Sequence, residues 1–128
     1  MYIEYNVYNI LKEWINLFFK DAIKGNMSLI ILSSLIEGEK YGYEITKTVY
    51  NLTNSAIQLK EGSLYPALHK LEKQGLVEGF WIQQEPGKPN RKYYRITELG
   101  SKTVQQEKEK WKSYMDIMGR VIYGTENT

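Results

Sequence analysis

Apolar residues recur every three or four positions in two long segments, one near each end of the chain, and this spacing predicts amphipathic helices. The first segment covers residues 3–24 and carries more large apolar side chains than one face of a small monomer usually needs. The second covers residues 98–123, with Thr97 as its expected N-cap. We expect residues 124–128 to form a flexible tail after it.

The final helix is predicted to carry one apolar stripe. This stripe consists of Val104, Trp111, Tyr114, Met115, Met118, Val121 and Ile122. A stripe that extends beyond the body of a small domain needs a partner, and the simplest partner is the same helix of a second copy. The pattern therefore predicts a homodimer with these residues in its interface, and Phe18 of the first helix is a further candidate for it.

Two shorter helices are predicted between these segments. Residues 27–36 are apolar nearly all round, as expected of a central helix that is packed on several sides. A turn over residues 37–40 follows, and then a helix over residues 43–52. Its predicted inward-facing residues are Ile45, Val49 and Leu52.

The segment of residues 60–76 predicts a short helix with two contrasting faces. Ser63 is a favourable N-cap, Pro66 is expected in the first turn, and Gly75 follows the end, where a left-handed residue is wanted. The apolar face consists of Leu64, Leu68 and Leu71. The other face carries Tyr65, His69, Lys70 and Lys73. Such donors and cations suit contacts with phosphates and base edges.

Two strand-like segments follow, at residues 76–82 and 91–96, separated by turn residues at 85–90. Helix, strand, turn and strand describe a winged helix, so the expected fold class is mainly α with a two-stranded β-wing. The segment between Pro86 and Thr97 contains four basic residues and no acid, although the net charge of the chain is only +2. Positive charge is therefore concentrated where a wing would contact the DNA backbone. The four bases are Lys88, Arg91, Lys92 and Arg95.

Three motifs in this order resemble the PadR family of bacterial transcriptional regulators. They are YGYEI at 41–45, GSLYPAL with LEKQGL at 62–76, and GKPNRKYYRITELG at 87–100. The resemblance covers about residues 25–121. It implies a winged helix-turn-helix at residues 25–97 and dimerisation through the helix at 98–123. Family members generally begin near Gly25, so the function of residues 1–24 does not follow from the resemblance.

The predicted function is that of a homodimeric repressor on a pseudo-palindromic operator in double-stranded DNA. Expected contacts with base edges are Ser63, Tyr65, Pro66, His69 and Lys70. Expected contacts with phosphates are Lys60, Lys73, Lys88, Asn90, Arg91 and Lys92, which fix the register. Tyr41 and Tyr43 lie near a predicted helix N-terminus, where amides favour phosphate, although their rings could equally cover core edges. Of Tyr93 and Tyr94, which alternate on a strand, one should pack inward.

The resemblance also implies a possible effector site, because in some PadR-like proteins a tryptophan of the final helix lines a cavity between subunits. Trp111 occupies the matching place, and flat aromatic compounds would stack there beside Met115 and Trp14. Packing is the other interpretation, since the extra N-terminal helix could fill such a cavity with Trp14, Phe18 and Phe19.

Composition excludes several other classes of protein. The 128 residues are enough for one domain, and the absence of cysteine excludes disulfides, thiolate redox sensing and cysteine-ligated zinc. His69, the only histidine, has no nucleophile motif or ligand companion, so we expect no enzyme, no metal and no cofactor. The N-terminus lacks a basic leader, and residues 27–36 are too few to span a bilayer, which predicts a cytoplasmic protein.

One alternative remains open on sequence grounds. The amphipathic helix at residues 3–24 could recruit a partner protein or lie on a membrane surface, with DNA binding weak or lost. The salt dependence of DNA binding would separate the two functions.

Overall fold

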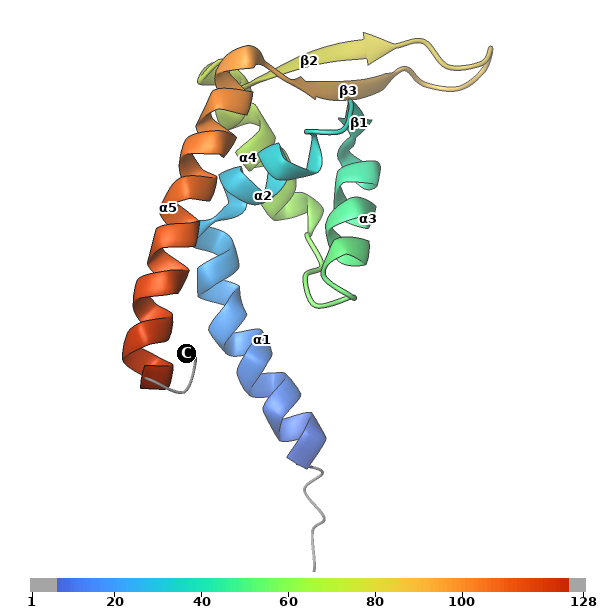
Figure 1. Ribbon diagram of the computed structural model, residues 1–128. Coiled ribbons are helices and arrows are strands. Elements are labelled where there is room, and N and C mark those ends of the chain that lie inside the picture. Colours follow the sequence, from blue (N-terminus) through green and yellow to red (C-terminus); the bar gives the residue numbers. More distant parts are fainter. Residues whose placement is uncertain (1–6, 125–128) are drawn as a thin grey trace, which may run out of the picture.

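The computed structural model describes residues 7–124, which form a helical body covered at one end by a small sheet (Figure 1). The helices are α1 (Val7–Gly25), α2 (Met27–Ser34), α3 (Gly42–Leu52), α4 (Glu61–Lys73) and α5 (Glu98–Tyr123). The strands are β1 (Lys40–Tyr41), β2 (Val77–Ile82) and β3 (Arg91–Ile96). The predicted fold class is confirmed. The second wing strand and the final helix have the expected bounds, and the first wing strand begins one residue later than expected. The part of the first helix predicted at residues 3–6 lies outside the described residues, as does the tail at 125–128.

The core lies between α2, α3, α4 and the sheet. Helix α2 contacts α3, α4 and α5, which explains why apolar residues are needed on several of its sides. Its residues Ile31 and Leu32 are fully buried. Of the three residues predicted to face inward from α3, Ile45 and Val49 do so, but Leu52 is exposed. Leu52 ends the helix and the chain then turns away, so no element covers it.

Helix α4 begins earlier than predicted. Lys60 is its N-cap, and the Leu64 N–H donates to the Lys60 carbonyl at 2.9 Å, so Ser63 is a helical residue and Pro66 lies in the second turn. Leu59 and Leu64 occupy the two positions of a hydrophobic staple, and both are buried in the core. Burial of this apolar pair, rather than a side-chain cap, sets the start of the helix.

The end of α4 agrees with the prediction. Gly75 has φ +74°, and its N–H donates to the Glu72 carbonyl at 3.1 Å. The Leu76 N–H donates to the Leu71 carbonyl at 3.0 Å, which completes a Schellman motif.

The sheet is antiparallel, with the strand order β1-β3-β2. Strands β2 and β3 form the predicted wing, with Val77 opposite Ile96 and Ile82 opposite Arg91. Strand β1 was not predicted, because two residues are too few to show an alternating pattern. It places Tyr41 opposite Tyr93 and so attaches the start of α3 to the wing.

Thr97 joins the end of α4 to the start of α5. Its hydroxyl donates to the Gly75 carbonyl at 2.6 Å and accepts from the Gly100 N–H at 3.0 Å, which confirms the predicted N-cap. Its own N–H donates to the Leu76 carbonyl at 3.1 Å. A Cβ at Gly100 would clash with the Leu76 carbonyl oxygen, so glycine permits this close approach.

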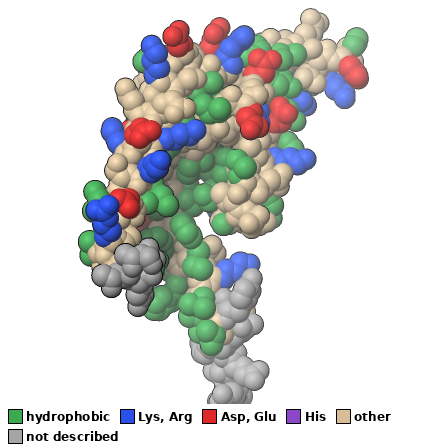
Figure 2. All heavy atoms as spheres, in the orientation of Figure 1, with side chains coloured by type: hydrophobic (Ala, Val, Ile, Leu, Met, Phe, Trp, Pro, Cys, Tyr) green, Lys and Arg blue, Asp and Glu red, His purple; other side chains and the backbone are tan. Residues whose placement is uncertain are grey.

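Helices α1 and α5 project from the body as two arms (Figure 1). Hydrophobic side chains gather along both arms, largely toward the space between them (Figure 2). Trp14 and Phe18 of α1 are 70% and 74% exposed. None of the helices within residues 7–124 is long and apolar enough to cross a membrane.

The apolar stripe of α5 continues from the core into solvent. Val104 is fully buried within the monomer, so its predicted place in a dimer interface is wrong: the body of the same chain covers it. The rest of the predicted stripe is exposed, and it comprises Trp111, Tyr114, Met115, Met118, Val121 and Ile122.

Candidate nucleic-acid interface

The solvent face of α4 carries half of the residues predicted to contact DNA. Leu64, Leu68 and Leu71 are buried on one side of the helix, which turns the opposite side outward. Exposed on or beside that outer side are Lys60, Ser63, Pro66, His69, Lys70 and Lys73. Within residues 7–124, these three lysines take part in no ion pair, so their charge remains available to an anionic partner.

Tyr65 occupies the flank of α4 that faces α3. Its ring is 47% exposed, and its hydroxyl group lies against Gly42, the first residue of α3. The side chain therefore contributes to the contact between the two helices and still presents part of its ring to solvent.

Glu72 connects α4 to the wing on the same flank. Its carboxylate accepts the Gly79 N–H at 3.1 Å and pairs with Lys92 Nζ at 3.3 Å. The Lys92 side chain is 32% exposed, and its ammonium lies 5.4 Å from the centre of the Tyr94 ring. The structure thus gives Lys92 an internal role in place of the predicted phosphate contact, because Glu72 neutralises its charge. The sequence could not show this pair, since twenty residues separate the partners.

The alternation of β3 divides its side chains between two faces. Tyr94 is buried on the face toward α4, and Tyr93 lies on the other face with Arg91 and Arg95. One tyrosine therefore packs inward, as predicted. Burial raises the pKa of the Tyr94 hydroxyl above its usual value of 10, and the nearby Lys92 ammonium opposes this effect.

The outer face of the wing presents two arginines, each over an aromatic ring. The Arg91 guanidinium lies 4.0 Å from the centre of the Tyr41 ring, and Arg95 lies 4.1 Å from that of Phe80. Arg95 also pairs with Glu78 at 3.8 Å. In the turn of the wing, Asn90 is exposed and Lys88 lies 3.9 Å from Glu85 on an exposed surface.

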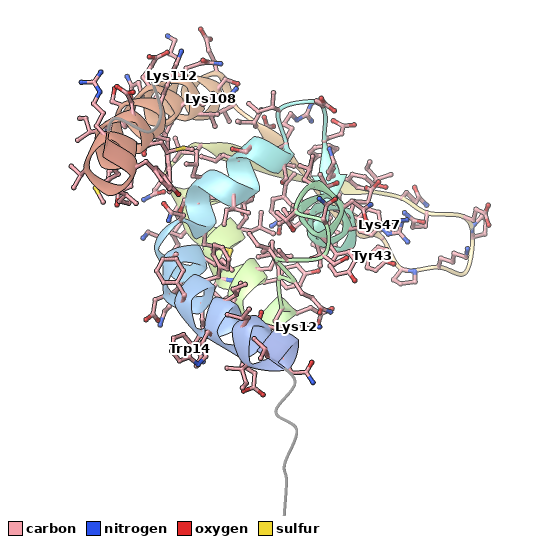
Figure 3. The ribbon with its side chains drawn as sticks, turned by 60° about the horizontal axis from the view of Figure 1, so that its bottom comes forward. Lys12, Trp14, Tyr43, Lys47, Lys108 and Lys112 are labelled. Atoms are coloured by element: carbon pink, nitrogen blue, oxygen red, sulfur yellow. The ribbon has the colours of Figure 1, made fainter. Side chains whose placement is uncertain are left out.

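The start of α3 adjoins the wing. Tyr43 is 65% exposed and stacks on Tyr41 with a centroid separation of 6.3 Å. Lys47, one turn later, is exposed on the same side of α3 as Tyr43 (Figure 3). Tyr43 was a predicted contact but Lys47 was not, although the four-residue spacing from Tyr43 was available as a signal. Tyr41 was expected beside the DNA backbone or at the core edge, but its contact with Arg91 was not predicted, because β1 was not recognised.

Three elements therefore present cations and hydrogen-bond donors next to one another: the outer face of α4, the start of α3 and the wing. Helix α4 contacts both α3 and β2, so one core holds all three in place. Such a surface suits contacts with a phosphate backbone, while the exposed side chains of α4 could reach into a groove.

Comparisons with known proteins agree with this arrangement. Residues 31–106 match the model of the transcriptional regulator PadR-like family. An uncharacterised protein from Lysinibacillus sphaericus is 36% identical over 106 residues, which are 83% of this chain and 96% of that protein. The structure of a transcriptional regulator from Clostridium thermocellum superposes with a TM-score of 0.71 and 37% identity, covering 80% of this chain and 98% of that one.

A further solved structure contains DNA. Bacillus subtilis PadR in complex with operator DNA superposes with a TM-score of 0.57 and 28% identity, covering 62% of this chain and 45% of that chain. The family model matches more than half of the sequence, and the winged helix is present in the structure. The chain therefore belongs to the PadR-like family of transcriptional regulators, and it is a DNA-binding regulator.

Proposed function

We propose that this protein is a homodimeric transcriptional repressor that binds a pseudo-palindromic operator. The observation that carries the proposal is the outer face of α4, where Lys70 and Lys73 have no ion-pair partner within residues 7–124. A recognition helix of this kind enters the major groove, and a two-fold dimer places two such helices about one helical turn apart.

The contacts fall into two classes. Base edges are read by Ser63, Tyr65, Pro66, His69 and Lys70. Phosphates are held by Lys60, Lys73, Lys88, Asn90 and Arg91, together with Tyr43 and Lys47 of α3. The complex of Bacillus subtilis PadR with operator DNA supports this assignment, because it shows a protein with a similar fold bound to an operator.

Dimerisation follows from the exposed stripe of α5. Met118 and Ile122 lie on the helix face that buries Val104 nearer the body, so one face continues from core to solvent. A second copy related by a two-fold axis presents the same stripe and would cover it. Helix α1 would join this interface through Trp14 and Phe18.

A planar aromatic effector would bind beside Trp111, with Met115 and Trp14 near it in the dimer. The Trp111 ring is 39% exposed and meets Tyr114 edge-on, with 5.9 Å between centroids. An effector that relieves repression must bind better to the conformation that does not bind DNA. Fluorescence of Trp111 in Trp14→Phe, Trp81→Phe protein reports the binding: quenching by planar aromatic compounds supports the site, and no quenching favours simple packing.

The test of the repressor function is a fluorescence-polarisation titration with DNA from upstream of the protein's own coding region. Random-sequence DNA is the control, and both are titrated at two salt concentrations. Specific binding should weaken steeply with salt, with a log–log slope of about −0.9 per phosphate contact. Lys70→Ala should weaken binding, whereas Lys102→Ala should not, because Lys102 lies on α5 and pairs with Glu98.

The exposed apolar face of α1 favours a second function, recruitment of a partner protein or membrane surface through Trp14 and Phe18. Binding of that kind relies on apolar burial and should change little with salt. Salt-insensitive binding with no preference for upstream DNA over random DNA would support this function and contradict the repressor.

A further inference from the structure

We infer that Tyr41 is a positioning residue that holds the Arg91 guanidinium in place for DNA binding. The guanidinium carbon lies 4.0 Å from the centre of the Tyr41 ring, within the range of a cation–π contact. Tyr41 pairs with Tyr93 across β1 and β3, and Arg91 precedes Tyr93 by two residues, which makes Tyr41 and Arg91 diagonal neighbours on one face. This inference rests on the proposed function.

Tyr41 is itself held from several sides. Its N–H donates to the Glu44 carboxylate at 3.3 Å, within the first turn of α3. Its ring meets Tyr93 edge-on at 5.3 Å and stacks on Tyr43 at 6.3 Å. The ring is thus fixed by a strand, a helix terminus and two aromatic neighbours, and it offers Arg91 a rigid surface.

Arg91 needs such a surface because it is exposed at the turn end of the wing strands, opposite Ile82. A free arginine side chain loses rotamer entropy when it binds a phosphate, and a stacked one has lost part of that entropy already. Stacking occupies one flat face of the guanidinium and leaves its N–H edge available for a phosphate. Arg91 forms no ion pair within residues 7–124, so its charge is not neutralised there.

The outer face of the wing carries a second arginine over an aromatic ring, and this pair serves as a control. Arg95 lies 4.1 Å from the centre of the Phe80 ring, but it also pairs with Glu78 at 3.8 Å. Its charge is therefore partly neutralised, and we expect it to contribute less to DNA binding. Phe80→Leu is thus the control for Tyr41→Leu, since each replaces an aromatic ring under an arginine by an aliphatic side chain.

The experiment measures the affinity of the full chain for upstream and random DNA across a series of salt concentrations. Tyr41→Leu should weaken binding by about two- to fivefold per protomer, which corresponds to the free energy of an exposed cation–π contact. Tyr41→Phe, which keeps the ring, should bind like the parent, and Phe80→Leu should have little effect. In the Arg91→Ala background, Tyr41→Leu should cause no further loss.

Three outcomes would overturn the inference: an unchanged affinity in Tyr41→Leu, a loss in Tyr41→Phe equal to that in Tyr41→Leu, or the same loss from Tyr41→Leu with and without Arg91. The last result would mean that Tyr41 acts independently of Arg91. A parent protein that binds neither DNA would instead contradict the proposed function, so the two failures are distinguishable.

Discussion

Tyr65 fills the space beside Gly42 in which any other residue would carry its Cβ. A Cβ at position 42 would lie 2.6 Å from the Tyr65 hydroxyl oxygen and 3.0 Å from the ring carbon that bears it. The contact joins the first residue of α3 to the second turn of α4. The two helices of the helix-turn-helix, α3 and α4, can therefore approach this closely because α3 has no side chain at position 42.

Gly42→Ala should destabilise the fold by about 1–3 kcal/mol, since the buried start of α3 must move or displace the Tyr65 ring. Gly62→Ala is the control: a Cβ there meets nothing within 4 Å, and alanine favours a helix, so stability should rise by up to about 1 kcal/mol. Urea unfolding measures both. Equal stability of the two variants would contradict the steric argument, and Tyr65→Phe should recover part of the loss in Gly42→Ala.

Removing the charge of Glu72 should have opposite effects on stability and on DNA binding. Glu72→Gln removes the ion pair with Lys92, which is partly exposed, so the loss of stability should be below about 1 kcal/mol. It also releases the Lys92 charge, so affinity for random DNA should rise and its salt dependence should steepen. Urea unfolding and a salt titration test this. Unchanged or weaker binding to random DNA would show that Lys92 adds no free charge to the interface.

Tyr94 should make stability fall at alkaline pH. The pKa of its hydroxyl is raised in the folded protein because of burial, above the value of about 10 expected in the unfolded chain. Below pH 10 both states are neutral and its contribution is constant. Between pH 10 and the folded-state pKa only the unfolded state loses the proton, so stability decreases. Chemical unfolding should show a shallower decline for Tyr94→Phe than for the parent, and identical slopes would refute the assignment.

A charge placed in the stripe of α5 should prevent dimerisation. Met118→Glu would bury a carboxylate without a partner and should raise the dissociation constant of the dimer by at least about tenfold. Ser113→Glu places the same group on the opposite, exposed side of the helix and should leave the dimer intact. Sedimentation at several concentrations separates monomer from dimer. A Met118→Glu protein as dimeric as the parent would exclude this stripe as the interface.

Two substitutions should separate base reading from phosphate contact. Tyr65→Ala should cost about 1–3 kcal/mol of specific affinity and spare binding to random DNA. Arg91→Ala should weaken both and reduce the salt slope by about 0.9 per lost contact. Polarisation titrations measure both quantities, after thermal unfolding has shown that each variant is folded. If the Tyr65→Ala variant bound upstream DNA as tightly as the parent, this result would contradict the recognition role of α4.

Features set by local chemistry could be predicted from the sequence. The cap at Thr97, the left-handed Gly75 and both wing strands depend on residues within a few positions of each other, and the structure agrees with them. Predictions that depended on distant residues were less successful. The start of α4 is set by the burial of Leu59 in the core, and the charge of Lys92 is cancelled by Glu72.

The candidate site shows the same division. Periodicity identified the outer face of α4, because this face lies opposite the buried leucines and all of these residues belong to one helix. The contact between Tyr41 and Arg91 requires knowledge that β1 pairs with β3, and two residues carry no signal for that. Periodicity also could not show where the stripe of α5 leaves the body, which is why Val104 was assigned to the wrong surface.

The Thr97 hydroxyl binds the Gly75 carbonyl, just after the end of α4, and the Gly100 N–H in the first turn of α5 at the same time. Helix α5 continues from this point for 26 residues, so it acts as a lever that pivots next to the C-terminal end of the recognition helix α4. At about 1.5 Å per residue, a tilt of a few degrees at Thr97 moves the far end of α5 by several ångströms. Conversely, fixing those far ends in a dimer fixes the distance between the two reading helices.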